Sequence, residues 1–143
     1  MNNPNLKLTA TKNFDVRFSE VDSMNIVWHG NYALYFEDAR ELFGKKYGLE
    51  YLFIYENGFY TPLVELHLNY KQPIRYQDNV QITITYRNTD AAKIIFDYEI
   101  VNLNTHKLMV KGYSVQVFLD KDYQLVWNCP TFYQNWKKEK GLL

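Results

Sequence analysis

Two periodicities divide the hydrophobic positions of this 143-residue chain. Between residues 31 and 47, apolar side chains recur every three or four positions, which is the spacing of an amphipathic α-helix. These apolar positions are Tyr32, Tyr35, Phe36, Ala39, Leu42 with Phe43, and Tyr47. Gly48 is a typical helix terminator, and Glu41 with Lys45 forms a favourable i,i+4 pair. The pattern therefore predicts one long helix that buries most of its surface.

Outside this helix the hydrophobic residues mostly alternate with polar ones, as expected for β-strands. The alternation predicts strands over residues 14–18, 64–70, 80–86, 94–100 and 108–119, and a last strand over residues 124–127. In the strand over residues 108–119 the apolar parity changes at Gly112, so we expect a β-bulge near it. A shorter helix is expected over residues 49–57, ended by Gly58. Pro130 and Thr131 predict the start of a C-terminal helix.

The order of these elements is strand, long helix, then four or five antiparallel strands. A helix that must bury so many aromatic residues favours an α+β architecture in which a strongly curved sheet wraps around the helix. The 13 Tyr and 9 Phe agree with a fold that buries large side chains. The length suits one core, and the chain contains no repeat or linker, so we expect residues 1–143 to form a single domain.

Composition and charge narrow the classes of function. Lys plus Arg and Asp plus Glu each number 16, so no net field draws the chain to nucleic acid or to an anionic membrane. The N-terminal segment is polar, and no apolar run has the length of a membrane span, so neither a signal peptide nor a membrane segment is expected. A single cysteine, Cys129, fits a reducing cytoplasm, and we interpret it as a packing residue.

The chemistry most visible in the sequence lies just before the long helix. Glu20 and Asp22 precede the expected helix entrance at residues 29–31. The free N–H groups of a helix N-terminus attract anions and can stabilise negative charge that develops on a carbonyl oxygen. An acid in this place can form a cap or a turn, or it can act on a substrate that the helix holds.

Other common site motifs do not occur in the sequence. His29, His67 and His106 lie far apart, and neither an HExxH motif nor a paired-cysteine spacing is present, so no metal site is predicted. The chain also has no GxSxG nucleophile elbow, no GxGxxG motif and no P-loop.

The segment EVDSMNIVWHGNY, residues 20–32, with the Ala-Arg pair at positions 39 and 40, resembles the signature of the hotdog-fold thioesterases. The resemblance is to the branch of 4-hydroxybenzoyl-CoA thioesterases and acyl-CoA thioester hydrolases. It continues through Thr61, Tyr70 and Pro73 and covers about residues 14–120. It implies a hotdog fold, cytoplasmic hydrolysis of an acyl-CoA thioester, and a homodimer or homotetramer with its site between subunits.

By this resemblance, Asp22 is the catalytic carboxylate. It would act as general base for water or as a nucleophile through a mixed anhydride, and the helix dipole favours the ionised form that both roles need. The backbone N–H of His29 would be the oxyanion donor. We interpret Glu20 as a supporting residue. Glu37 and Glu41 are the alternative catalytic acids, because other hotdog branches place the acid on the central helix.

The substrate-binding residues that the resemblance implies include Asn25, which stands where the family usually has glycine. Asn tolerates a left-handed backbone best among non-glycine residues, so the turn is expected to survive. If the glycine serves close approach of substrate, the Asn25 amide would crowd the site. Asn31 is expected to cap the helix entrance, Tyr32 to lie in the core or the pocket wall, and Thr61 to contact substrate.

The CoA portion would need scattered basic residues, because no phosphate-binding loop is present. The candidates are Lys71, Arg75, Arg87, Lys93 and Lys111, and the resemblance favours Lys93.

Two other functions stay open from the sequence. One is an acyl-ACP thioesterase, which differs in the carrier and not in the chemistry. The other is a non-catalytic dimer that binds an acyl thioester, and Asn25 is the feature that most favours it. A hotdog dehydratase is disfavoured because the sequence lacks an Asp-His pair at the spacing of that group. The sequence does not identify the acyl group.

Overall fold

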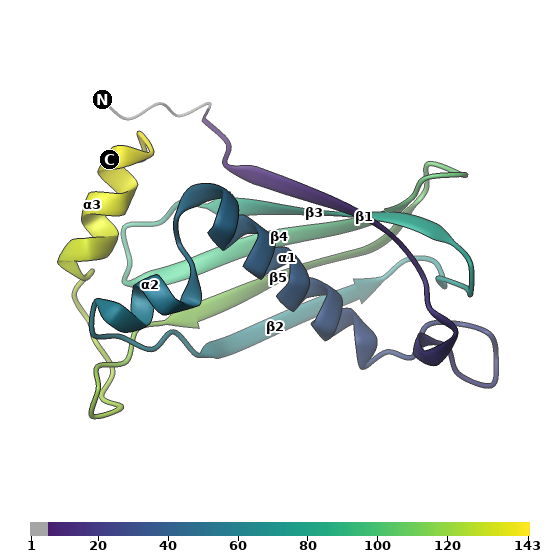
Figure 1. Cartoon of the computed structure of the whole chain (residues 1–143), viewed down its shortest axis with the longest axis horizontal. Coiled ribbons are helices and arrows are strands. Elements are labelled where there is room, and N and C mark those ends of the chain that lie inside the picture. Colours follow the sequence, from purple (N-terminus) through teal and green to yellow (C-terminus); the bar gives the residue numbers. More distant parts are fainter. Residues whose placement is uncertain (1–5) are drawn as a thin grey trace.

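A five-stranded antiparallel sheet packs against one long helix in the computed structural model, which describes residues 6–143 (Figure 1). The elements in chain order are β1 (Thr9–Asp15), the 3-10 turn η1 (Phe18–Glu20), α1 (Asn31–Tyr47), α2 (Tyr51–Glu56), β2 (Leu63–Tyr70), β3 (Asn79–Arg87), β4 (Lys93–Asn102), β5 (Leu108–Val117) and α3 (Thr131–Glu139). The sheet order β1-β3-β4-β5-β2 confirms the expected α+β architecture. Residues 1–5 lie outside the described residues. They belong to the polar N-terminal segment in which no signal peptide is expected.

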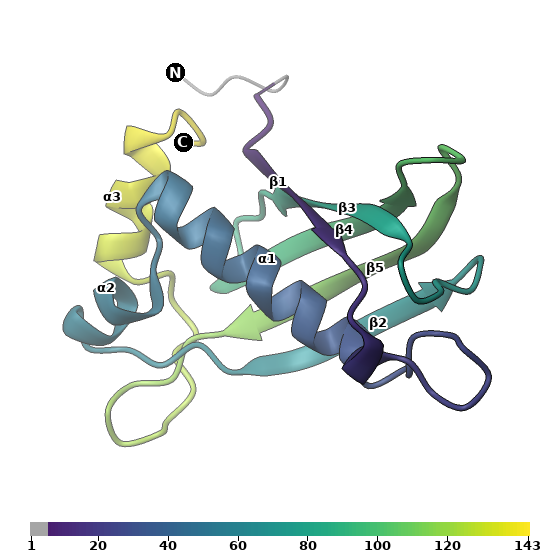
Figure 2. The same cartoon turned by 45° about the vertical axis from the view of Figure 1, so that its right-hand side comes forward.

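The long helix α1 lies across one face of the curved sheet, as Figures 1 and 2 show. Its bounds agree with the periodicity, because Gly48 takes a left-handed φ of 72° and donates its N–H to the Gly44 carbonyl. The ring of Phe36 stacks on that of Tyr98 in β4, with centroids 4.0 Å apart and planes 3° from parallel. The aromatic positions that predicted the helix therefore form the contact between helix and sheet. None of the helices within residues 6–143 is long and apolar enough to cross a membrane.

Gly112 of β5 marks a close approach of backbone and helix. The register shift in β5 lies at Met109, three residues earlier, so the expected bulge is near the glycine but not at it. A Cβ atom on Gly112 would lie 2.3 Å from the His67 carbonyl oxygen and 2.9 Å from the Phe36 ring. Glycine is therefore needed here because α1 and β2 both press against this point of β5.

The predicted elements differ from the structure in several places, and the strand expected over residues 108–119 ends at Val117. The first strand is Thr9–Asp15 and not residues 14–18, because an edge strand rich in Thr and Lys shows little apolar alternation. Residues 124–127 do not form a strand, and only an isolated bridge joins Leu119 to Leu125. The second helix is shorter than residues 49–57.

The C-terminal helix α3 begins at Thr131, as predicted, and closes one end of the sheet. The hydroxyls of Tyr133 and Tyr86 hydrogen-bond to each other in the core, and the Trp136 indole N–H donates to the Tyr47 carbonyl at 2.7 Å. Cys129, just before this helix, packs partly against the core, and burial raises the pKa of its thiol.

Candidate active site

A tight turn brings Asp22 to the entrance of α1. The Asp22 N–H donates to the Ile26 carbonyl at 2.9 Å, and the Asn25 N–H donates to the Asp22 carbonyl at 3.0 Å. Asn25 has a φ of 60°, so it takes the left-handed conformation expected of the residue that replaces glycine. An antiparallel bridge between Val21 and Val27 holds the two ends of the turn side by side. The turn thus places Asp22 beside the residues that lead into the helix.

One oxygen of the Asp22 carboxylate holds the turn, and the other is free among the described residues. Its Oδ1 accepts the Met24 N–H at 2.8 Å. Its Oδ2 has no hydrogen-bond partner among residues 6–143. The side chain is half-buried. The geometry therefore lets one carboxylate both form the turn and contact a substrate or water molecule.

Two backbone N–H groups at the entrance of α1 are unpaired among the described residues. The Trp28 N–H donates to the Glu20 carbonyl and the Asn31 N–H donates to the Trp28 carbonyl, each at 2.9 Å. The N–H groups of His29 and Gly30 meet no acceptor in the part of the chain that the structure describes. They lie at the positive end of the helix dipole. Such a pair can receive a carbonyl oxygen that becomes negative during a reaction.

Asn31 fixes the helix entrance in a way that differs from the prediction. The N-cap position is Gly30, which makes no side-chain cap bond. The Asn31 side-chain amide instead donates to the Glu20 carbonyl oxygen at 2.8 Å. The Glu20 carboxylate accepts the Arg17 N–H at 2.7 Å. The Asn31 bond ties η1 to α1 through the Glu20 main chain, and the supporting role of the Glu20 side chain stays a prediction.

Two tyrosines of α1 lie under this entrance. Tyr32 is 3% exposed and packs edge-to-face on Tyr70, so it belongs to the core. Burial raises the pKa of Tyr32 to about 12. Tyr35 is also buried, and its hydroxyl has no hydrogen-bond partner among the described residues. Burial, and then the neighbouring Glu20 carboxylate, raise the pKa of Tyr35.

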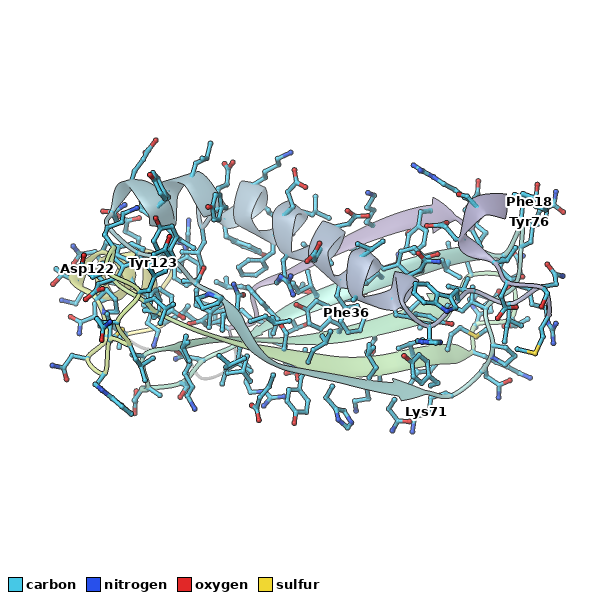
Figure 3. The ribbon with its side chains drawn as sticks, turned by 90° about the horizontal axis from the view of Figure 1, so that it is seen from below. Phe18, Phe36, Lys71, Tyr76, Asp122 and Tyr123 are labelled. Atoms are coloured by element: carbon cyan, nitrogen blue, oxygen red, sulfur yellow. The ribbon has the colours of Figure 1, made fainter. Side chains whose placement is uncertain are left out.

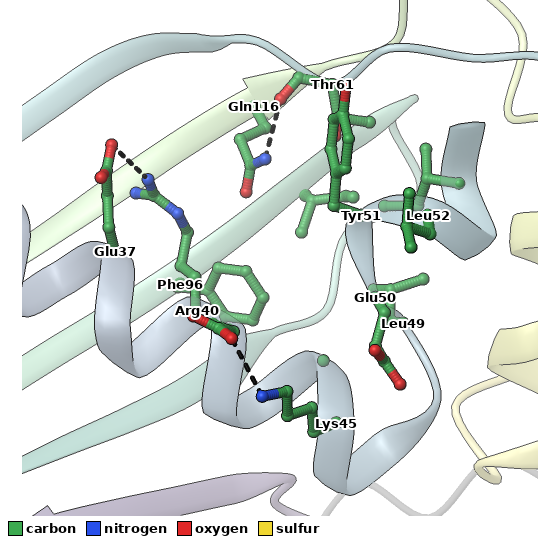
Figure 4. A pocket seen from close by; sticks show the side chains of 14 residues that line it. Glu37, Arg40, Lys45, Leu49, Glu50, Tyr51, Leu52, Thr61, Phe96 and Gln116 are labelled. Carbon is green, nitrogen blue, oxygen red and sulfur yellow. Dashed lines mark hydrogen bonds and ion pairs between the residues drawn. The ribbon is translucent and has the colours of Figure 1, made fainter.

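A cavity of about 590 Å³ lies between the C-terminal part of α1, α2 and the sheet (Figure 4). Its lining combines an apolar floor with a charged rim. The floor includes Ile94 and Phe96 of β4, and the lining further comprises Glu37, Arg40, Glu41, Gly44, Lys45, Leu49, Glu50, Tyr51, Leu52, Ile54, Thr61 and Gln116.

The two alternative acids on α1 belong to the rim of this cavity. Both side chains are exposed: Glu37 lies 3.6 Å from Arg40, and Glu41 lies 2.9 Å from the Lys45 ammonium. The hydrogen bond from Lys45 lowers the pKa of the Glu41 carboxyl. Ion-paired surface carboxylates of this kind have an ordinary structural role.

The structure separates the predicted site residues into two groups. The first group surrounds the entrance of α1 and comprises Asp22, Asn25, His29, Asn31 and Tyr32. Thr61 lines the cavity, where its carbonyl accepts the Gln116 amide at 2.8 Å, and Lys93 is the exposed first residue of β4.

The length of β2 sets the separation of the two groups. Tyr70, at the end of β2, packs on Tyr32, whereas Thr61 lies nine residues earlier, about 30 Å away along an extended chain. Figure 3 shows the same two ends, with Phe18 and Tyr76 at one and Asp122 and Tyr123 at the other. Of the other basic candidates, Lys71, Arg75 and Lys111 are exposed and Arg87 pairs with Asp97 on the sheet.

Strand β2 is an edge of the sheet and carries much of the exposed apolar surface. Leu63, Val64, Leu66 and Tyr70 are each at least 38% exposed. Leu34 on α1 and Trp28 at its entrance are 55% and 52% exposed. An edge strand with this much apolar surface is a typical site of pairing with another chain.

Sequence reasoning missed three features of the site. Trp28 packs over Gly30, where a Cβ would lie 2.1 Å from the indole ring. Arg40 belongs to the Ala-Arg pair of the motif, which does not by itself indicate a role, and Gln116 stands in an ordinary strand pattern that gives no signal. Within residues 6–143 no three His, Cys, Asp or Glu side chains form a metal-binding group, and the absence of a bound metal stays a prediction.

Comparisons with known proteins identify the family and the fold of this chain. The model of the family described as the thioesterase-like superfamily matches residues 16–136. The putative acyl-CoA thioesterase YneP of Bacillus subtilis is 29% identical over 113 residues, which cover 79% of this chain and 81% of that protein. The chloroplastic acyl-acyl carrier protein thioesterase ATL3 of Arabidopsis thaliana is 27% identical over 111 residues, 78% of this chain and 58% of that protein.

The solved structure of a DHNA-CoA thioesterase from Staphylococcus aureus has the same fold, with a TM-score of 0.80 and 25% sequence identity. The match covers 94% of this chain and 92% of that one. The expected hotdog fold is thereby confirmed.

Proposed function

This chain belongs to the thioesterase-like superfamily, and from that premise we propose that it hydrolyses an acyl-CoA thioester to a free acid and CoA. The observation that carries the proposal is the pair of N–H groups of His29 and Gly30, which have no acceptor within residues 6–143 and lie beside the Asp22 turn. A thioester carbonyl bound there would meet two donors and the positive end of the α1 dipole.

The reaction needs charge stabilisation on oxygen and attack on carbon. The carbonyl oxygen accepts hydrogen bonds from the His29 and Gly30 N–H groups and becomes negative as the carbon becomes tetrahedral. The free Oδ2 of Asp22 takes a proton from water, or attacks the carbon itself to form a mixed anhydride that water then cleaves. In both routes the CoA sulfur leaves as thiolate and gains a proton. The His29 side chain, which is exposed, has no part in this mechanism.

Oxygen isotopes can identify the nucleophilic route. Repeated turnover in ¹⁸O-water introduces label into the Asp22 carboxylate only when Asp22 forms an anhydride that water attacks at the aspartyl carbon. A general base keeps its own oxygens, as does an anhydride that water attacks at the acyl carbon, so label in Asp22 is the result that identifies nucleophilic attack. Mass spectrometry of the peptide that contains Asp22 gives the answer.

The predicted site residues lie in two groups that are far apart in one copy of the chain. This separation supports a homodimer as the active form. If two copies pair their β2 edges about a two-fold axis, the strands run antiparallel. The start of one β2, with Thr61, then lies beside the end of the other, near the partner's α1 entrance. Such a dimer would also cover the exposed apolar residues of β2, Leu34 and Trp28. Further pairing of dimers into a tetramer stays a prediction.

The carrier is the main alternative within the same chemistry. The likeness to an acyl-acyl carrier protein thioesterase favours a test of that substrate. The roles of Asn25 and Lys93 in substrate binding are part of the same proposal. We expect the enzyme to act in the cytoplasm on these small or protein-bound thioesters, without binding nucleic acid or a membrane.

The test is thiol release from a panel of acyl-CoA esters and from the same acyl groups on a carrier protein. The proposal predicts turnover of at least one CoA ester. Turnover of only the carrier-bound esters would identify the alternative carrier. Binding of these esters without turnover would favour the non-catalytic function instead, and reversion of Asn25 to glycine would then show whether its amide blocks the site.

A further inference from the structure

The guanidinium of Arg40 lines the cavity beside α1, and only some of its N–H donors have partners among the described residues. The Arg40 side chain is 19% exposed, and its one ion pair within residues 6–143 is to Glu37 at 3.6 Å, longer than a good charge-assisted hydrogen bond. Glu37 itself is 62% exposed and largely solvated. Burial raises the pKa of the Tyr98 hydroxyl, and the nearby Arg40 guanidinium partly offsets this rise. A guanidinium has five N–H donors, so several are left to face the cavity.

An acceptor with a fixed orientation lies across the same cavity. The Gln116 side-chain Nε2 donates to the Thr61 carbonyl at 2.8 Å, which determines which end of the amide is which. Its Oε1 meets no donor among the described residues. Figure 4 shows the Arg40 guanidinium between Glu37 and the Gln116 amide, and all three residues line the same cavity.

This arrangement suits a group that both accepts and donates a hydrogen bond. A hydroxyl or an amide would accept from Arg40 and donate to the Oε1 of Gln116. A carboxylate or phosphate only accepts, so it would face the amide oxygen as well as the rim carboxylates of Glu37, Glu41 and Glu50. The apolar floor formed by Ile94 and Phe96 suits the uncharged part of a substrate.

We propose that Arg40 and Gln116 together bind a hydroxyl or amide group of the thioester and thereby determine specificity. The proposal rests on the thioesterase function. Two parts of an acyl-CoA carry such a group: the pantetheine arm has amides, and the acyl group can have a hydroxyl. Both sources share the same chemistry of recognition, and the substrates below distinguish them.

The experiment compares wild type with Arg40→Met and Gln116→Met on paired substrates. One pair is hexanoyl-CoA and 3-hydroxyhexanoyl-CoA, and a second is benzoyl-CoA and 4-hydroxybenzoyl-CoA. A third pair is hexanoyl-CoA and the hexanoyl thioester of ethanethiol, which has no amide. For the substrate that has the recognised group, Arg40→Met loses a hydrogen bond to a charged group, which predicts a fall of roughly 10- to 100-fold in kcat/KM. Gln116→Met loses a bond between neutral groups, which predicts a fall of roughly 3- to 10-fold. The fall should appear mostly in KM, because Arg40 does not contact the reacting atoms.

The pairs identify the source. If the pantetheine amide is bound, both variants lose activity on all CoA esters and keep it on the ethanethiol ester. If an acyl hydroxyl is bound, only the preference for the hydroxylated member of a pair disappears. Equal losses on every substrate, or no loss at all, would overturn the proposal.

Controls separate this inference from folding and from the thioesterase function. Arg40→Lys keeps the charge without the planar fork and should recover only part of the effect. Lys46→Met removes an exposed cation from the same helix, outside the cavity, and should leave the substrate preferences unchanged. If wild type hydrolyses none of these esters, calorimetric binding of the thioether S-hexyl-CoA tests the amide arm directly. Arg40→Met should then weaken binding by a similar factor, and unchanged affinity would contradict recognition of the amide.

Discussion

Asp22 shows at the residue scale how one side chain can have a structural and a chemical role. Its Oδ1 holds the turn by accepting the Met24 N–H, while its Oδ2 is free among the described residues. The turn therefore needs an oxygen at this position but does not need a charge. An amide in its place would keep the turn and lose the base, so the two roles can be separated by one substitution.

The buried phenol of Tyr32 should make the free energy of unfolding fall at alkaline pH. Burial raises its pKa to about 12 from an ordinary value near 10, so the folded state holds the phenol proton more strongly than the unfolded state. This contribution is complete below pH 10 and disappears as the pH rises through 12. The free energy of unfolding, measured in urea between pH 9 and 11.5, should fall less steeply in Tyr32→Phe. Tyr76→Phe, which changes an exposed ring, is the control, and parallel curves for wild type and Tyr32→Phe would contradict this account.

The residues that could be recognised from sequence were those in a local motif. Asp22, His29 and Asn31 lie within ten residues, and the left-handed backbone of Asn25 followed from the glycine that it replaces. The bond from the Asn31 amide to the Glu20 carbonyl could not be predicted, since it depends on how η1 folds back on α1. The Gln116 amide donates to the Thr61 carbonyl, 55 residues away, and no local sequence pattern predicts this hydrogen bond.

Among the elements, α1 connects the candidate site to the core. Its predicted bounds were confirmed because periodicity, the glycine stop and the aromatic positions all agree. The edge strand β1 was misplaced because its alternation is weak, and the bridge at Leu125 is too short to form a strand. Element type was thus predictable wherever burial imposed a strong period, and boundaries failed where one face is solvated.

Gly112 gives the sharpest test of the packing between α1, β5 and β2. In Gly112→Ala the new Cβ would meet the His67 carbonyl at 2.3 Å, and a strand backbone cannot move aside without breaking its ladder. We expect a loss of about 1–3 kcal/mol in the free energy of unfolding, as for other overpacked cores. Lys111→Ala, at the neighbouring exposed position, should change it by less than about 0.5 kcal/mol. Equal denaturation midpoints for the two variants would show that the contact is looser than described.

At the scale of the whole molecule, the two groups of site residues lie at opposite ends of one copy. The α1 entrance has the candidate groups for chemistry, whereas Thr61 in the lining of the cavity lies about 30 Å away along β2. The sequence motif could not predict this separation, because the distance depends on how α1 and β2 pack in three dimensions. The proposed two-fold pairing of β2 would bring an entrance of one copy to the cavity of the other. The single domain expected over residues 1–143 stays a prediction.

Disruption of the β2 edge should therefore affect assembly and activity together. Leu66→Lys places a charge on the apolar edge, where Leu66 is 39% exposed, and should convert a dimer into monomers in light scattering. We expect thiol release to fall with it, although the Asp22 turn is intact. Glu99→Lys changes an exposed residue of β4 and should preserve both properties. A wild-type protein that is monomeric and fully active would refute the composite site.

The most direct measurement of the central claim is thiol release from the best acyl-CoA substrate by wild type and by Asp22→Asn. The asparagine oxygen can still accept the Met24 N–H, so the turn should remain while the base is lost. Asp78→Asn is the matched control, because Asp78 likewise uses a carboxylate oxygen to accept the Arg75 N–H in a turn. The account predicts a fall of roughly 10²- to 10⁴-fold in kcat for Asp22→Asn and little change for Asp78→Asn. Full activity in Asp22→Asn would contradict it and would direct attention to Glu37 and Glu41.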